Sequence, residues 1–286
     1  MAGYARAVQR SIPTDLILGG ATAAYQIEGA AAEDGRRPSI WDAFARVPGA
    51  VIDGHTGDVA CDHYHRMPAD VAMMRDLGLQ SYRFSTSWSR VCPDGGAPNA
   101  AGLDFYSRLV DELLDADIMP WLTLYHWDLP QVLEEAGGWP SRDTASRFVD
   151  YALAVHEKLG DRVDNWTTLN EPWCSSFLSY IAGAHAPGRQ SVADGLAAGH
   201  HLLLAHGMAV QALRDAGAER LGITLNFTVA DPVDPTNPFD VDAARRIDEQ
   251  YNRFFVDPIL RGSYPETLLA DVGHLGLDAV VQDGEM

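Results

Sequence analysis

Short apolar or β-branched segments, each bounded by residues that interrupt regular structure, alternate along the chain with longer segments of helical pattern. The short segments predict strands and the longer ones predict helices. The five expected strands are Leu16–Ala24, Ser81–Ser87, Met119–Tyr125, Asn165–Asn170 and Leu221–Phe227. The expected helices cover residues 68–77, 102–116, 141–159, 192–216, 242–260 and 268–275. Strands that alternate with helices indicate a parallel sheet with right-handed crossover connections.

A parallel sheet of this kind can be an open doubly wound sheet or a (β/α) barrel. The doubly wound fold would carry G-x-G-x-x-G after its first strand, but Gly19-Gly20 is followed by Ala-Thr-Ala-Ala. Polar and aromatic residues follow almost every expected strand, which is typical of barrel enzymes. No linker rich in Pro, Gly or Ser divides the chain. We therefore expect an α/β fold in which residues 1–286 form a single domain, an incomplete (β/α) barrel.

Composition excludes several classes of protein. The 286 residues include 21 Lys and Arg against 40 Asp and Glu, and the formal net charge of −19 argues against a nucleic-acid or membrane partner. No segment approaches the roughly 18 apolar residues of a membrane span. The three cysteines, Cys61, Cys92 and Cys174, form no CxxC pair, and no His, Cys and Asp cluster suggests a metal or another cofactor. The N-terminus has no apolar region of a secretory signal, which predicts a cytoplasmic protein.

The segment Trp166–Pro172 carries the strongest chemical signal. Pro172 has no N–H and ends the strand, so Glu171 should point into the mouth of a barrel. A carboxylic acid between Trp166 and Trp173 would lie in a low dielectric that favours its neutral form, as a general acid requires. The structural alternative is a surface glutamate in a loop after a strand.

Two further strand ends carry residues suited to a sugar. His126 and Trp127 follow the third strand and combine a hydrogen-bonding edge with a flat apolar face, although a core histidine packed against aromatic residues is the alternative. Gln26 follows the first strand, and its amide can bridge two adjacent hydroxyls because it both donates and accepts. Glu28 is a candidate second acid, and a plain turn that ends at Gly29 is the alternative.

Arg83 and Asn226 are the remaining polar residues expected at the mouth. Arg83, in the second strand, should point inward among apolar neighbours, where an arginine nearly always has a carboxylate partner. Such a pair could be purely structural. Asn226 ends the fifth strand, and a turn residue and a substrate contact are equally good interpretations.

The chain resembles glycoside hydrolase family 1, the β-glucosidase family, from about Asp15 to its C-terminus. The resemblance lies in five ordered segments: Gln26–Gly29, Tyr82–Arg90, Tyr125–Pro130, Trp166–Pro172 and Leu221–Asn226. It implies a (β/α)8 TIM barrel, of which about the first five βα units are present. It also implies a retaining β-glucosidase that cleaves terminal β-linked glucose from oligosaccharides or aglycones. The substrate would be a small-molecule β-glucoside or cello-oligosaccharide, and no cofactor is required.

The resemblance also implies a role for each matching residue. Glu171 resembles the general acid/base, and Asn170 resembles the residue that holds the sugar 2-hydroxyl. Gln26 and His126 resemble ligands of the 3- and 4-hydroxyls, with Trp127 as their aromatic neighbour. The two remaining matches lie near the nucleophile: Arg83, which would contact that carboxylate, and Asn226, on the leaving-group side.

The sequence departs from the family in its last part. The family nucleophile is the Glu of a T-E-N-G segment, which is absent here, and five expected strands are fewer than the eight of a closed barrel. The chain is therefore expected to be roughly the N-terminal three-fifths of a family member, whether as a truncated sequence, a shortened gene product or one of two chains. Its open edges predict self-association. A 6-phospho-β-glycosidase and a non-catalytic or inactive sugar-binding fragment remain the alternatives.

Overall fold

Five strands form one parallel sheet in the computed structural model, which describes residue 13 and residues 15–285. Each strand pairs with the next one along the chain, which is the order of a (β/α) barrel. The strands are β1 (Gly19–Ala21), β2 (Ser81–Ser85), β3 (Met119–Tyr125), β4 (Asn165–Asn170) and β5 (Arg220–Thr224). All five expected strands are confirmed, and β1 is shorter than expected because only three of its residues pair with β2.

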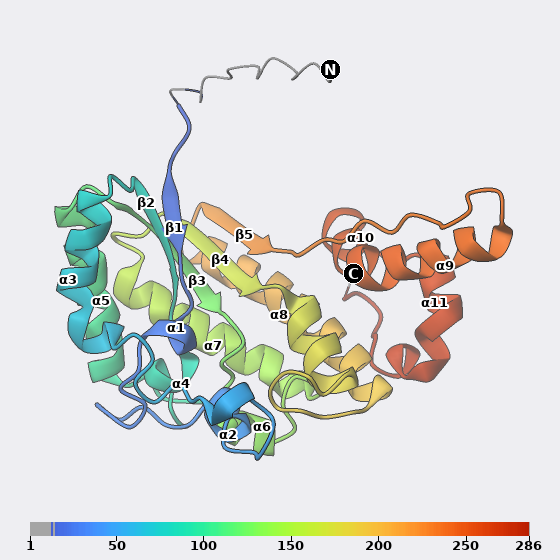
Figure 1. Cartoon of the computed structure of the whole chain (residues 1–286), viewed down its shortest axis with the longest axis horizontal. Coiled ribbons are helices and arrows are strands. Elements are labelled where there is room, and N and C mark those ends of the chain that lie inside the picture. The colour runs from blue at the N-terminus through green and yellow to red at the C-terminus, as the bar shows by residue number, and fades with distance from the viewer. Residues whose placement is uncertain (1–12, 14, 286) are drawn as a thin grey trace, which may run out of the picture.

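Long helices follow the strands and lie along one side of the sheet (Figure 1). They are α3 (His63–Asp76), α5 (Ala100–Asp115), α7 (Arg142–Leu159) and α8 (Val192–Asp215). After β5 come α9 (Pro238–Asp248), the π-helical η3 (Glu249–Arg253), α10 (Phe254–Arg261) and α11 (Glu266–Val272). The expected helix over residues 242–260 is therefore three pieces, and the one expected from residue 68 begins at His63 with Pro68 inside it.

Shorter elements occupy the connections. They are the helices α1 (Ala24–Ile27), α2 (Ile40–Phe44), α4 (Trp88–Val91) and α6 (Gln131–Glu135), the 3₁₀ turns η1 (Ile52–Gly54), η4 (Gly273–Leu275) and η5 (Leu277–Ala279), and the π-helical η2 (Cys174–Ile181). Because η2 begins shortly after β4, at Cys174, it lies next to the strand end that carries Glu171.

The main core lies between the sheet and these helices. In α7 the buried residues Ala145, Phe148, Ala152, Val155 and Leu159 recur every three or four positions, which places them on one face. That face packs with Leu122 and Leu124 of β3 and with the opposing stripe of α5. A smaller cluster joins α8 to α10 and α11 through Leu196, Leu203, Phe254, Phe255 and Leu268.

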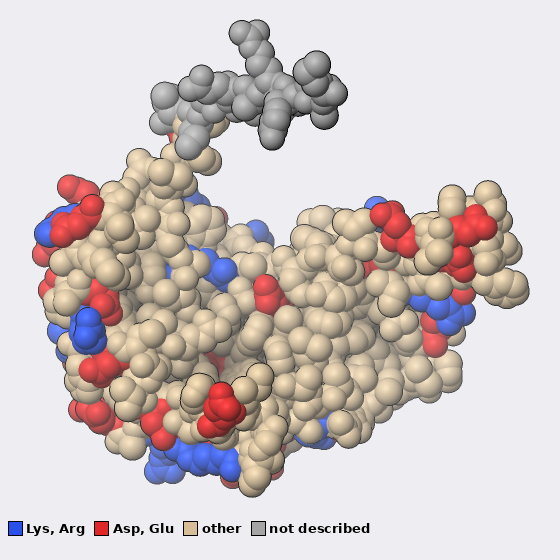
Figure 2. All heavy atoms as spheres, in the orientation of Figure 1, with Lys and Arg blue, Asp and Glu red and all other residues tan. Residues whose placement is uncertain are grey.

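The two outer strands of the sheet each have one neighbour among the described residues. β1 pairs with β2, and β5 pairs with β4. Next to β1, the side chains of Leu16, Ile17 and Leu18 are half exposed. Charged side chains lie mostly around the margin of the face in Figure 2, whose middle is largely uncharged. In the part of the chain that the structure describes, no helix is long and apolar enough to cross a membrane.

Candidate active site

Asn170, the last residue of β4, joins residues from three strand ends. Its Oδ1 accepts a hydrogen bond from Nη2 of Arg83 on β2 at 2.8 Å, and its Nδ2 lies 3.2 Å from Nε2 of His126, which follows β3. Its carbonyl oxygen accepts from Nε1 of Trp127 at 2.8 Å. The structure therefore brings four of the residues expected at the mouth into one hydrogen-bonded network.

This network determines how His126 presents its ring. Since Asn170 Oδ1 accepts from Arg83, Asn170 Nδ2 is the donor to His126, and Nε2 of His126 is the acceptor. The remaining proton of the neutral ring is then on Nδ1. Burial, with a smaller effect of the Arg83 charge, lowers the pKa of His126 to about 4. The imidazole is neutral at neutral pH and offers one donor to a ligand.

Arg83 has no carboxylate within ion-pair distance in the described part of the chain, so the expected ion pair is not formed there. Its Nε donates to Thr123 Oγ1 at 2.9 Å and its Nη2 to Asn170, so the hydrogen bonds that the guanidinium makes within the described residues go to neutral oxygens. Burial lowers the pKa of Arg83, and the negative charge of Glu171 partly opposes that effect. The two groups thus interact at long range across the mouth.

Two residues at adjacent strand ends have backbone conformations that favour glycine. Trp127 has φ = 78° and Glu171 has φ = 50°. The indole bond to Asn170 holds Trp127, and Glu171 donates its N–H to the carbonyl oxygen of Thr224 on β5 at 2.8 Å. Such strained backbone conformations persist only where contacts with the surrounding structure hold them, and they cluster at functional sites.

Glu171 is partly exposed, and its carboxylate contacts Cys174 of η2, which in turn lies beside Asn226. Cys174 Sγ donates to Glu171 Oε2 at 3.5 Å. Asn226 Nδ2 donates to the hydroxyl of Tyr251 at 2.9 Å and lies 3.7 Å from Cys174 Sγ. Asn226 therefore lies on the Glu171 side of the mouth, in contact with Cys174 and Tyr251.

A pocket of about 180 Å³ lies beside this network. Its walls include Gln26, His126 and Trp127, which were expected to line a sugar site, together with Tyr25 and Trp41. It is smaller than the roughly 300–1,000 Å³ of pockets for drug-sized ligands, so it suits a small ligand. Its mixture of aromatic faces and polar edges is the surface that a sugar ring requires.

Sequence reasoning missed three aromatic residues at this pocket. Tyr25 and Trp41 line it, with ring centroids 6.0 Å apart. The ring of His185 lies 5.4 Å from that of Trp41 and 5.2 Å from that of Trp127. Tyr25 directly follows the first expected strand, so the strand-end pattern could have indicated it, whereas Trp41 and His185 lie further along the connections and could not be found in that way.

Glu28 is not a second acid at the mouth, and that prediction is wrong. Its side chain is buried, with Oε2 accepting from Arg90 Nε at 3.0 Å and Oε1 accepting from the Tyr106 hydroxyl at 2.5 Å. Arg90 is itself buried against the ring of Tyr64. Both carboxylate oxygens are occupied by structural partners, which leaves Glu28 unavailable for chemistry.

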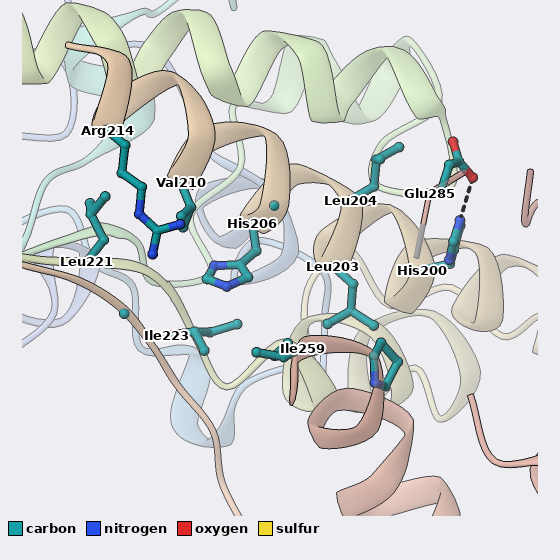
Figure 3. Close-up of a pocket in the computed structure, with 13 residues that line it drawn as sticks. His200, Leu203, Leu204, His206, Val210, Arg214, Leu221, Ile223, Ile259 and Glu285 are labelled. Carbon is teal, nitrogen blue, oxygen red and sulfur yellow. Dashed lines mark hydrogen bonds and ion pairs between the residues drawn. The ribbon is translucent and has the colours of Figure 1, made fainter. Parts of the chain in front are cut away.

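The larger cavity in Figure 3 lies elsewhere. This groove of about 430 Å³ runs between α8, β5 and α10, where β5 has no second neighbour among the described strands, and none of the expected site residues lines it. Its histidines bond to protein groups: His206 Nδ1 lies 2.8 Å from Thr168 Oγ1, and His200 Nε2 lies 3.1 Å from Glu285 Oε2. In the described residues no group of three His, Cys, Asp or Glu side chains is placed to hold a metal ion.

Comparison with known families agrees with this geometry. The family described as glycosyl hydrolase family 1 matches residues 8–286. The chain belongs to that family. The resemblance seen in the five sequence segments and the barrel fold expected from it are therefore confirmed, with five βα units present.

Similar proteins are mostly named β-glucosidases. Thermostable β-glucosidase B of Thermobispora bispora is 55% identical over 275 residues, which cover 94% of this chain and 56% of that protein. β-Glucosidase A of Acetivibrio thermocellus is 48% identical, over 91% of this chain and 58% of that protein. The structure of a psychrophilic β-glucosidase from Micrococcus antarcticus has a TM-score of 0.94 at 60% identity, covering 96% of this chain and 58% of that one. The chain thus spans less than two thirds of the length of these relatives.

Proposed function

We propose that this chain carries the acid/base and the sugar-binding half of a retaining β-glucosidase. The reaction is cleavage of a terminal β-linked glucose from an oligosaccharide or an aglycone. The observation that carries the proposal is the Asn170 network, which gathers Arg83, His126 and Trp127 beside Glu171 at the carboxyl ends of the strands. That edge is where barrel enzymes place their chemistry.

Glu171 is the group that moves the proton in this proposal. It protonates the leaving oxygen in the first step and removes a proton from water in the second. Glu171 directly follows β4, and its N–H donates a hydrogen bond to Thr224 of β5. Both strands therefore restrict its backbone, which supports this role. Asn226 belongs to the leaving-group side, beside the same carboxylate.

The other residues orient the sugar. Asn170 contacts the 2-hydroxyl, and Gln26 and His126 bind the 3- and 4-hydroxyls in the small pocket, with Trp127 as an aromatic wall. The neutral ring of His126 supports this assignment, because a neutral donor binds a hydroxyl without requiring a counter-charge. Arg83 faces the place where the attacking carboxylate would be.

A retaining mechanism needs a second carboxylate about 5–5.5 Å from the first. Glu28 is unavailable, and the sequence has no T-E-N-G segment. We propose that a carboxylate outside this chain attacks the anomeric carbon and that Arg83 then receives the charged partner it lacks.

Two alternative functions are less well supported. A 6-phospho-β-glycosidase must attract an anionic sugar, which the net charge of −19 disfavours, and the similar proteins described above are named β-glucosidases. A fragment that binds sugar without turnover would use the same pocket and differs only in the absence of the nucleophile.

The test uses the whole 286-residue chain. Castanospermine is the first ligand, because a related β-glucosidase of Thermotoga maritima has a structure in complex with it. Calorimetry should detect binding that is weakened by His126→Ala and by Asn170→Ala, while Glu157→Ala, an exposed change on α7, leaves it unaltered. Absence of binding would refute the sugar-binding assignment.

Hydrolysis of an aryl β-glucoside is the second measurement, with Glu171→Gln beside the wild type. We expect no turnover from either protein, because the attacking carboxylate is missing. Turnover that disappears in Glu171→Gln would show that the acid/base is assigned correctly and that a carboxylate of this chain attacks. Turnover that survives in Glu171→Gln would refute the role of Glu171.

We further propose that residues 1–286 fold as one domain and self-associate through the outer strands. The exposed apolar residues Leu16–Leu18 beside β1 and the groove beside β5 support a second copy as the partner, since both edges belong to the same sheet. A cytoplasmic location stays a prediction from the sequence.

A further inference from the structure

Cys174 lies between Glu171 and Asn226 and has no part in the reaction proposed above. It is the first residue of η2, and its N–H donates to the carbonyl oxygen of Glu171 at 2.9 Å. Its thiol donates to Glu171 Oε2 at 3.5 Å, and Asn226 Nδ2 approaches the sulfur from another side at 3.7 Å. Among the described residues, this thiol is the one side chain that donates a hydrogen bond to the Glu171 carboxylate.

Other charged or titratable groups also face Glu171, but none of them orients its carboxylate through a hydrogen bond. The Glu171 charge affects the pKa of Arg83 on β2, of His185 after η2 and of Tyr251 on η3. These groups act through space, because none of them forms a hydrogen bond with the carboxylate. A long-range attraction changes the energy of the carboxylate, whereas a hydrogen bond also selects its rotamer.

The position of the thiol is itself fixed by three elements. Cys174 belongs to η2, and Asn226 follows β5 and is held by the Tyr251 hydroxyl of η3 at 2.9 Å. The rings of Trp173 and Tyr251 pack with their centroids 4.0 Å apart, which joins η2 to η3 next to the sulfur. The donor to Glu171 is therefore held by packing as well as by its own backbone.

We propose that Cys174 is a positioning residue whose thiol sets the direction of the Glu171 carboxylate. The proposal rests on the acid/base role of Glu171. A thiol suits the task because it is a weak donor and orients the group without strongly favouring its ionised form. A charged donor in the same place would favour the anion and weaken the acid.

The thiol also keeps its proton under working conditions. Burial, and then the neighbouring Glu171 charge and hydrogen bond, raise the pKa of Cys174 to about 12. The S–H group is therefore a donor throughout the neutral range. Cys92 provides a matched control, because burial also raises its pKa to about 12, and there the additional charge is that of Asp150.

The first test measures thiol reactivity in the whole chain. Wild type and Glu171→Gln are treated with iodoacetamide at about pH 8.5, and mass spectrometry follows each cysteine, with exposed Cys61 as the internal standard. Removing the charge should speed alkylation of Cys174 about tenfold, equivalent to one pKa unit. Cys92 should change less than about twofold. An unchanged Cys174, or an equal change at both buried thiols, would overturn the contact.

The second test measures the carboxylate directly. In chains labelled with ¹³C-glutamate, Cys174→Ala should shift the Glu171 carboxyl resonance, and Cys92→Ala should leave it in place. Cys174→Ser, which restores a donor, should return the resonance toward its wild-type position. The positioning role is refuted if Cys174→Ala leaves the Glu171 resonance unchanged, or if Cys92→Ala shifts it by the same amount.

Neither measurement depends on turnover, so the two proposals can fail separately. If castanospermine binding and hydrolysis experiments reject the glycosidase role, the thiol–carboxylate contact is still tested by alkylation. The alkylation experiment also needs no substitution of Cys174 itself, so it stands even if Cys174→Ala fails to fold.

Discussion

The buried pair of Glu28 and Arg90 yields a sharp prediction about stability. Glu28 is 4% exposed and Arg90 is 0% exposed, and the Glu28 carboxylate accepts hydrogen bonds from Arg90 and Tyr106. Burial alone would lower the pKa of Arg90, but the charge and hydrogen bond of Glu28, together with Tyr106 and Tyr64, offset this and leave the pKa raised. Glu28→Ala removes that compensation and leaves a buried guanidinium without its counter-charge.

The expected loss is about 3–5 kcal/mol of unfolding free energy, the usual cost of removing one partner of a buried ion pair. Unfolding entropy of about 2.1 cal/mol/K per residue gives about 0.6 kcal/mol/K for a chain of 286 residues. The loss should therefore lower Tm by about 5–8 °C. Urea unfolding followed by circular dichroism measures the free energy, and a thermal melt measures Tm.

The control is Glu157→Ala, which changes the same residue type at an exposed position of α7 and should alter stability by less than about 0.5 kcal/mol. The double variant Glu28→Leu with Arg90→Met should recover part of the loss, because apolar side chains of similar size require no counter-charge. If Glu28→Ala costs less than about 1 kcal/mol, the description of this pair as an essential buried contact is wrong.

Three further predictions concern pH, backbone conformation and the sheet edge. Burial raises the pKa of Asp128 to about 7, so the stability of the fold should fall as the pH rises from about 4 to 7 and the side chain ionises. Asp128→Asn cannot ionise, so its unfolding free energy relative to wild type should increase by up to about 4 kcal/mol when the pH is raised from about 4 to about 8. Equal differences between the two proteins in urea titrations at both pH values would contradict this. Gly29→Ala would place a Cβ 2.2 Å from the carbonyl oxygen of Val59 at φ = 67°, so its Tm should fall more than that of Gly49→Ala, where φ = 80° but the space is open; equal melting temperatures would count against the contact. Ile223→Lys places a charge in the groove beside β5 and should weaken self-association in light scattering across a concentration series, whereas an unchanged mass would reject that edge as the contact.

Local sequence pattern was sufficient for most of the fold. The spacing of apolar residues in α7 and the short β-branched segments are properties of neighbouring residues, and they predicted all five strands. The pattern failed where the helix from Asp242 onward is interrupted by η3, because a π-helical turn changes the period without any residue that marks it. It also failed at the edge strand β1, where pairing with one neighbour sets the length.

The residue types of the candidate site were readable because parallel strands bring their carboxyl ends to one edge. The sequence therefore predicted that Gln26, Arg83, His126, Asn170 and Glu171 would lie at that edge, but not what each one contacts. Tertiary structure decided that Arg83 bonds to Asn170 and Thr123, and that Glu28 bonds to Arg90. It also placed the Cys174 thiol against Glu171. Local pattern reports on side chains a few positions apart, whereas Glu28 and Arg90 are separated by 62 positions and are joined only when the helices and strands pack.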